Sequence, residues 1–168
     1  MQTILDRVLA DMIVHEQGQP KHIQHFLKVH AFARFIGQQE HLDEKTQYIL
    51  ELAALVHDIG INPSRAKYHS SAGAYQQIEG PPLARRMLAR YDIEDEILER
   101  VCYLVAHHHT YTQMDGLDYR ILVEADFLVN LYEDQSSVQA VQTALSRWFT
   151  TKTGRWLLQT MFLAAPSV

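Results

Sequence analysis

Histidine is the most informative residue type in this chain, because its 168 residues include ten histidines. Three of them are consecutive, at His107, His108 and His109, and another is followed directly by an acid, in His57-Asp58. Imidazole is the commonest metal ligand of proteins, and hard or borderline divalent ions accept imidazole together with carboxylate. We therefore expect inward-facing histidines and aspartates that gather in one place to hold a metal ion.

The pair His57-Asp58 continues an apolar helix face. Ile49 and Ala53 precede His57 by eight and four positions, which places all three on one side of a helix. Asp58 follows at about 100° around the helix axis, so the two side chains can approach one ion from neighbouring directions. An aspartate among apolar residues is costly unless it is paired or bound to a metal, and this favours a metal site at the pair.

Asp126 occupies a comparable position later in the chain. It follows Leu122 by four residues and precedes Val129 by three, so it also lies on an apolar stripe. A lone carboxylate in such a place is often paired with an arginine or caps another helix. The metal-binding interpretation gains weight here because a second carboxylate and several histidines are also expected to face inward.

Histidines on two further predicted helices share this placement. His25 lies on one face with the apolar residues that follow it, His22 joins that face three residues earlier, and His30 lies on a neighbouring line. His108 and His109 continue the apolar face of the helix that precedes them. Several imidazoles with one or two aspartates fit Mn or Fe best, with Mg or Zn as alternatives, at one or two ions per chain.

The elements that must position these side chains are all predicted to be helices. No segment alternates with the period of a strand, whereas apolar residues recur at helical spacing throughout. We expect Asp43 to cap the third helix and Gly60 to stop it, residues 61–68 to form a loop, and Gly80-Pro81-Pro82 to break one helix and start another. The expected helices cover residues 2–16, 20–39, 42–60, 70–77, 84–91, 93–109, 117–134, 137–149 and 153–162. The fold class is thus all-α, a single compact helical bundle over residues 1–168.

Composition excludes several function classes. The net charge is −5 and no basic cluster occurs, so a sequence-independent nucleic-acid binder is not expected. No apolar stretch approaches the length of a membrane span, so no membrane partner is expected either. The single cysteine, Cys102, excludes an internal disulfide and predicts a cytoplasmic location. Patterns of other metal, nucleotide and hydrolase sites are absent, since the sequence contains no CxxC, HExxH, GxxxxGKS/T or GxSxG.

Read in order, the pattern H…HD…HH…D resembles the HD-domain metal-dependent phosphohydrolases. The resemblance is carried by LVHDIG, by HIQHFLKVHAFARFIG upstream and by ILVEADFLVN downstream, and it covers about residues 20–133. It implies an HD-domain fold and an enzyme that hydrolyses phosphate ester or anhydride bonds with divalent metal ions. The remaining helices are expected to pack on this domain.

The resemblance also implies a ligand set. The family's first ligand is a His four residues before a Val and eight before an Ala, which His25 matches, with His30 as the alternative. The pair His57-Asp58 carries over directly, and the last ligand usually belongs to an Ala-Asp dipeptide, which Asp126 matches. Asp58 would bridge two ions and orient the attacking water, so Asp58 and His57 are predicted to be catalytic.

Two-metal members similar to the diadenosine-tetraphosphate hydrolases add a His-Gly-Pro motif at the start of a helix and a later His-Thr motif. His109-Thr110 matches the second motif, and His108 beside it is a further predicted ligand. The first motif reads Glu-Gly-Pro here, so Glu79 is predicted to replace the histidine at the start of a helix, with His69 as another candidate.

The resemblance implies a small phosphorylated substrate, with a nucleotide favoured, and a homodimer remains an open alternative to a monomer. The negative charge of the substrate would be met by cations that follow the HD pair and the Pro-Pro step. Alternatively, these cations are solvated surface charges. They are Arg65, Lys67, Arg85 and Arg86. Two other functions compete, a cyclic-nucleotide phosphodiesterase and a metal-binding or ligand-sensing module without catalysis. The HHHT…DG run is similar to the HHE…DG of cyclic-dinucleotide diesterases with an HD-GYP domain.

Overall fold

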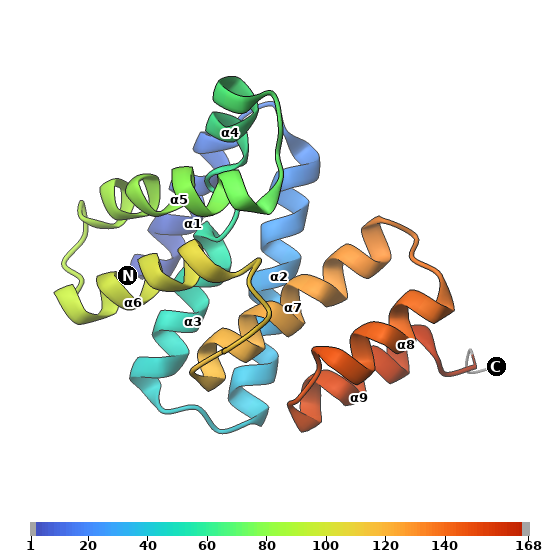
Figure 1. The fold of residues 1–168 in the computed structure, drawn as a ribbon. Helices are drawn as coiled ribbons and strands as arrows, with labels where there is room; N and C mark the ends of the chain where they lie inside the picture. Colours follow the sequence, from blue (N-terminus) through green and yellow to red (C-terminus); the bar gives the residue numbers. More distant parts are fainter. Residues whose placement is uncertain (1–2, 166–168) are drawn as a thin grey trace.

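The structure is a computed structural model that describes residues 3–165. Nine α-helices and no strand are present in this range, so the all-α fold class is confirmed (Figure 1). The helices are α1 (Ile4–His15), α2 (Pro20–Gln39), α3 (Glu44–Val56), α4 (Ile61–Tyr68), α5 (Gly73–Leu88), α6 (Asp95–His107), α7 (Leu117–Glu133), α8 (Val138–Arg147) and α9 (Lys152–Phe162). None of these helices combines the length and the hydropathy needed to cross a membrane.

Local sequence signals set most helix starts. The side chains of Thr3, Asp43, Ser137 and Thr151 each accept a hydrogen bond from a backbone N–H in the first turn of the helix that follows. Pro20 opens α2 at a position where a missing N–H costs no helical bond. Among the helices that carry candidate ligands, α3 therefore begins at a side-chain cap and α2 begins at a proline.

Helix α3 lies at the centre of the fold. Every residue from Ile49 to Val56 is buried, because α1, α2, α6 and α7 all pack against this helix (Figure 1). Helix α2 also packs along α7, and α5 packs against α6. Polar groups at the end of α3 are consequently placed inside the protein, between α2, α6 and α7.

Two predictions about local structure are wrong. Residues 61–68, expected as a loop, form α4, in which Pro63 lies in the first turn, where its missing N–H is tolerated. Helix α5 runs through Pro81 and Pro82, which were expected to break it. Close packing overrides this signal: a Cβ added at Gly80 would lie 2.9 Å from Val105 Cγ1, so α5 and α6 are in tight contact there. Glu79 therefore lies inside a helix and not at its start.

Helices α8 and α9 form a hairpin on the side of the molecule away from α5 and α6 (Figure 1). The hairpin is joined to the rest by Glu124 of α7, which is fully buried. Its Oε1 accepts hydrogen bonds from the backbone N–H groups of Thr150 and Thr151, and its Oε2 accepts one from the Thr151 hydroxyl. Burial raises the pKa of the Glu124 carboxyl, although these hydrogen bonds favour the charged form.

Candidate metal centre

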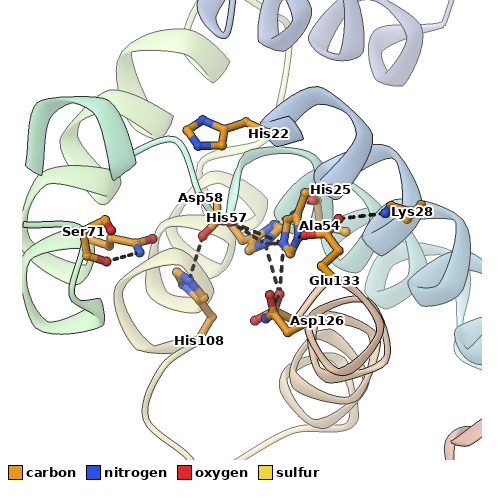
Figure 2. Close-up of polar contacts among 12 residues, drawn as sticks. His22, His25, Lys28, Ala54, His57, Asp58, Ser71, His108, Asp126 and Glu133 are labelled. Carbon is orange, nitrogen blue, oxygen red and sulfur yellow. Dashed lines mark hydrogen bonds and ion pairs between the residues drawn. The ribbon is translucent and has the colours of Figure 1, made fainter. Parts of the chain in front are cut away.

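Four helices deliver the candidate ligands to one place. His57 is the C-cap of α3 and Asp58 follows it, while His108 is the C-cap of α6. His25 comes from α2 and Asp126 from the middle of α7 (Figure 2). Since α3 and α6 pack side by side and both end here, their last residues meet α2 and α7 in the interior.

A first cluster gathers around His25. Its Nε2 lies 3.1 Å from Asp126 Oδ1, 3.3 Å from His57 Nε2 and 3.4 Å from Asp58 Oδ2 (Figure 2). The His57 Nε2 atom lies 3.4 Å from the same Asp58 oxygen and 3.7 Å from Asp126 Oδ1. Two imidazole nitrogens and two carboxylate oxygens thus face one shared space.

A second cluster uses the other oxygen of Asp58. His108 Nε2 lies 3.5 Å from Asp58 Oδ1, and ligand atoms of Asp58, His108 and His109 lie within 4.8 Å of one another. His25, His57 and Asp58 satisfy the same condition. Asp58 therefore belongs to both clusters and offers one oxygen to each, which is the arrangement of a carboxylate that bridges two ions.

The outer nitrogens of the imidazoles are already engaged. His57 Nδ1 donates to the backbone oxygen of Ala54 at 2.9 Å, and His108 Nδ1 donates to that of Val105 at 2.9 Å. His25 Nδ1 lies 3.1 Å from Glu133 Oε2, and Lys28 pairs with the same carboxylate. These contacts orient the rings and leave Nε2 as the free ligand atom, as in the metal sites of other proteins.

The residues present fit a divalent ion. The Nε2 atom of His109 is buried without a hydrogen-bond partner among the described residues, and that of His108 is buried with only the 3.5 Å contact to Asp58 Oδ1. Buried polar atoms are nearly always partnered, so these two nitrogens point to an ion as their partner. Imidazole and carboxylate in one set suit Mn, Fe or Zn, with Mg as a harder alternative.

The electrostatics of the first cluster couple its histidines to its acids. Burial by itself lowers the pKa of the His57 imidazole, but the charges of Asp58 and Asp126 outweigh it and raise that pKa well above its ordinary value. For His25, burial also lowers the pKa, and the hydrogen bond with Asp126 brings it above its ordinary value. Without an ion, protons on these imidazoles balance the two carboxylates.

The acids shift in the opposite direction. Burial alone would raise the pKa of Asp58, but the charge of His57 and the nearby His108 ring, whose Nε2 lies 3.5 Å from Asp58 Oδ1, hold it well below its usual range. Burial likewise opposes ionisation of Asp126, and its hydrogen bonds with His25 and His57 hold its pKa low. His109 differs from the other histidines, because burial and the neighbouring His108 lower its pKa to about 4.

A cavity of about 190 Å³ opens beside the clusters. It is lined by Lys21, His22, His25, Asp58, Ile61, Arg65, Gln76, His109, Asp126, Asn130, Glu133 and Asp134. Arg65, one of the cations that line it, donates from Nη1 to His22 Nε2 at 3.2 Å. The other ring nitrogen of His22 lies 2.8 Å from Glu16 Oε2, and Glu16 is buried. The buried carboxylate thereby holds His22, and His22 holds Arg65 at the cavity.

The structure brings together most of the predicted ligands, namely His25, His57, Asp58, His108, His109 and Asp126. Glu79 is not among them, because its carboxylate accepts hydrogen bonds from Lys67 at 2.7 Å and Tyr68 at 2.8 Å. His30 lies 3.2 Å from Glu51 instead of facing the first cluster, and His69 is exposed at the end of α4.

Of the four predicted substrate cations, Arg65 alone lines the cavity. Lys67 pairs with Glu79, Arg85 pairs with Glu99, and Arg86 is exposed outside the cavity. Acids on the next helix along the chain occupy Lys67 and Arg85, and no spacing rule within one helix predicts such pairs.

Sequence reasoning missed Lys21, Gln76 and Asn130 as cavity residues. Asn130 had a usable signal, because it lies one turn after Asp126 and its Nδ2 donates to Asp126 Oδ1 at 2.9 Å. Lys21 and Gln76 had none, since a lysine or glutamine on a helix is usually a surface residue.

Comparison with known proteins agrees with this geometry. Residues 23–142 match the family model described as HD domain. No match was found among curated proteins or among solved structures.

Proposed function

The chain belongs to the HD domain family, and we propose that it is a phosphohydrolase that cleaves a nucleotide or another small phosphate ester with metal-activated water. The observation that carries this proposal is the position of Asp58. Its Oδ2 lies beside the Nε2 atoms of His25 and His57, and its Oδ1 lies beside the Nε2 atom of His108. Sites that hold two metal ions about 3.5–4 Å apart are typical of enzymes that hydrolyse phosphate esters, and Asp58 is placed to serve such a site.

When bound, divalent ions polarise a phosphoryl oxygen and lower the pKa of water. The chain's own residues would do the rest. Asp58 and His57 would fix the position of the nucleophile relative to the phosphate, because both are held by contacts on their other sides. Mn or Fe is the proposed cofactor, at one or two ions per chain, since the ligand set mixes imidazole and carboxylate.

The cavity supports an anionic substrate. Lys21 and Arg65 line it without an ion-pair partner among residues 3–165, so both side chains can meet phosphate oxygens. A guanidinium presents several N–H donors to phosphate in a fixed geometry, which suits Arg65 for this role. The second cluster supports a relation to the two-metal members similar to diadenosine-tetraphosphate hydrolases. The proposed location of the enzyme is the cytoplasm.

The cyclic-dinucleotide alternative has less support. The run that suggested it ends in Asp115-Gly116, and the Asp115 carboxylate pairs with Arg100 at 2.9 Å. Arg100 also binds Asp118 at 2.7 Å. None of these three side chains lines the cavity beside the clusters, so the resemblance of the run does not extend to the site.

The test is phosphate release from a panel of nucleoside mono-, di- and triphosphates, dinucleoside polyphosphates and cyclic nucleotides, with Mn²⁺ or Fe²⁺ supplied. We expect turnover of at least one member of the panel and its loss in Asp58→Ala. A matched pair of variants tests the cavity: Arg65→Ala should raise KM, whereas Arg86→Ala should not. Bound metal without turnover of any substrate would favour a ligand-sensing module, and failure to bind metal would reject the proposal.

A further inference from the structure

Helix α5 turns one unusual face toward the metal centre. Gly73, Gln76 and Gly80 recur at spacings of three and four residues, so they lie on one side of the helix. A Cβ added at Gly73 would lie 2.6 Å from His109 Cγ, and one added at Gly80 would lie 2.9 Å from Val105 Cγ1. The two glycines therefore let α5 approach the end of α6, with Gln76 between them.

The helix is equally close to the segment that follows the HD pair. A Cβ added at Gly60 would lie 2.8 Å from the backbone oxygen of Gln76 and 2.8 Å from the backbone nitrogen of Gly80. Gln76 thus lies between the segment that follows Asp58 and His109, which is a residue of the second cluster. It lines the same cavity as both of them.

The side-chain amide of Gln76 has one satisfied and one unsatisfied end. Its Nε2 donates to the backbone oxygen of Ser71 at 2.7 Å, which fixes the orientation of the amide (Figure 2 marks this bond at Ser71). Its Oε1 is buried and has no hydrogen-bond partner among the described residues, and the whole residue is only 6 % exposed. An unpartnered buried carbonyl oxygen is costly, so it calls for a partner.

Three buried atoms of α5 and of the end of α6 lack a hydrogen-bond partner among the described residues, and each can donate an electron pair to a cation. They are Gln76 Oε1, His108 Nε2 and His109 Nε2. Gln76, His109 and Asp58 line one cavity, and His108 Nε2 lies 3.5 Å from Asp58 Oδ1, so an ion held by Asp58 is the common partner that these atoms call for.

We propose that Gln76 Oε1 is a ligand of the ion held by Asp58, His108 and His109. This inference rests on the proposed function. It assigns to Gln76 the role that the sequence suggested for Glu79, which lies three residues later on α5 and is engaged by Lys67. A neutral oxygen ligand adds no negative charge, so the positive field that attracts phosphate is kept, and carbonyl oxygen favours the harder ions Mn and Mg.

The test is titration of the metal-free protein with Mn²⁺, in which the electron paramagnetic resonance of free Mn²⁺ counts the ions bound. Two variants test the side-chain oxygen as a ligand. Gln76→Leu and Gln76→Glu both lose the hydrogen bond to Ser71, but only Gln76→Glu keeps an oxygen that can bind the ion. Gln77→Leu is the matched control, since Gln77 is adjacent and its Oε1 accepts from the Thr110 hydroxyl.

We expect the unmodified protein to bind two ions, and Gln76→Leu to bind the second at least about tenfold more weakly with the first unchanged. Gln76→Glu should bind the second ion as tightly as the unmodified protein or more tightly, and its melting temperature should rise more on addition of Mn²⁺. Gln77→Leu should match the unmodified protein in both measurements.

The possible failures are distinguishable. Binding of no ion by the unmodified protein would reject the proposed function itself. Binding of two ions with equal affinities in the unmodified protein and Gln76→Leu would overturn the role of Gln76 and leave the proposed function standing. If Gln76→Leu does not fold, Gln76→Glu decides: a second ion bound more weakly than in the unmodified protein overturns the inference.

Discussion

Binding of the first metal ion should release protons near neutral pH. His25 and His57 must be deprotonated to act as ligands, and the pKa of each is raised, although burial lowers it, because Asp58 and Asp126 favour the charged rings. The two carboxylates release none, since burial alone would raise their pKa values but the histidines hold them low. Each proton displaced makes the apparent metal affinity pH-dependent.

The sign and size of the effect follow from this arrangement. Below the raised pKa values the proton competes with the ion, so affinity falls as pH falls, by about tenfold per pH unit for each proton. Between pH 7 and pH 6 the first ion should weaken by about tenfold if His57 alone is charged, and by about a hundredfold if His25 is charged as well. His109, whose pKa is lowered to about 4, adds no such dependence to the second ion in this window.

Calorimetric titration of the metal-free protein with Mn²⁺, in two buffers of different ionisation enthalpy, measures the number of protons released. We expect at least one proton at pH 6 and pH 7, and a smaller number in Asp126→Asn, because that change removes the carboxylate that contacts both rings. Binding of the first ion with no proton release, and with the same affinity at pH 6 and pH 8, would refute the reasoning.

Three further predictions follow from side-chain contacts. Gly73→Ala should weaken binding of the second ion, measured by metal content, because the new Cβ would lie 2.6 Å from the ring of His109. Glu124→Ala should lower the free energy of unfolding by roughly 3 kcal/mol in denaturant titration, since it leaves buried donors such as the Thr151 N–H unpaired. Glu79→Gln should leave metal content and melting temperature unchanged, and a loss of metal would restore Glu79 as a ligand.

Much of the candidate metal centre could be predicted because its residues sit on strongly apolar helix faces. His57, Asp126 and His108 continue stripes of residues that must be buried, and a side chain on such a stripe has nowhere to point but inward. Their mutual proximity does not follow from periodicity alone. It was expected from the order H…HD…HH…D, and the structure brings these side chains together where α3 and α6 end.

The errors arose where long-range packing outweighs local preference. Pro81 and Pro82 normally interrupt a helix, yet α5 continues because its glycines pack tightly against α6 and the segment after Asp58. The helix break expected at Pro81 and Pro82 wrongly placed Glu79 at the start of a helix, whereas it lies inside α5. The cations Lys67 and Arg85 looked free in the sequence, but acids on other turns or helices neutralise them.

The sequence by itself determined the helical fold class, the inward direction of residues such as His57, His108 and Asp126, and the chemistry that such donors support. These properties depend on residue type and on spacing along one helix. Tertiary structure alone decided which cations remain available to a substrate, and it placed Gln76 beside Asp58 and His109. The physical reason is that partner choice depends on distances between helices, which side-chain fit at positions such as Gly60, Gly73 and Gly80 sets.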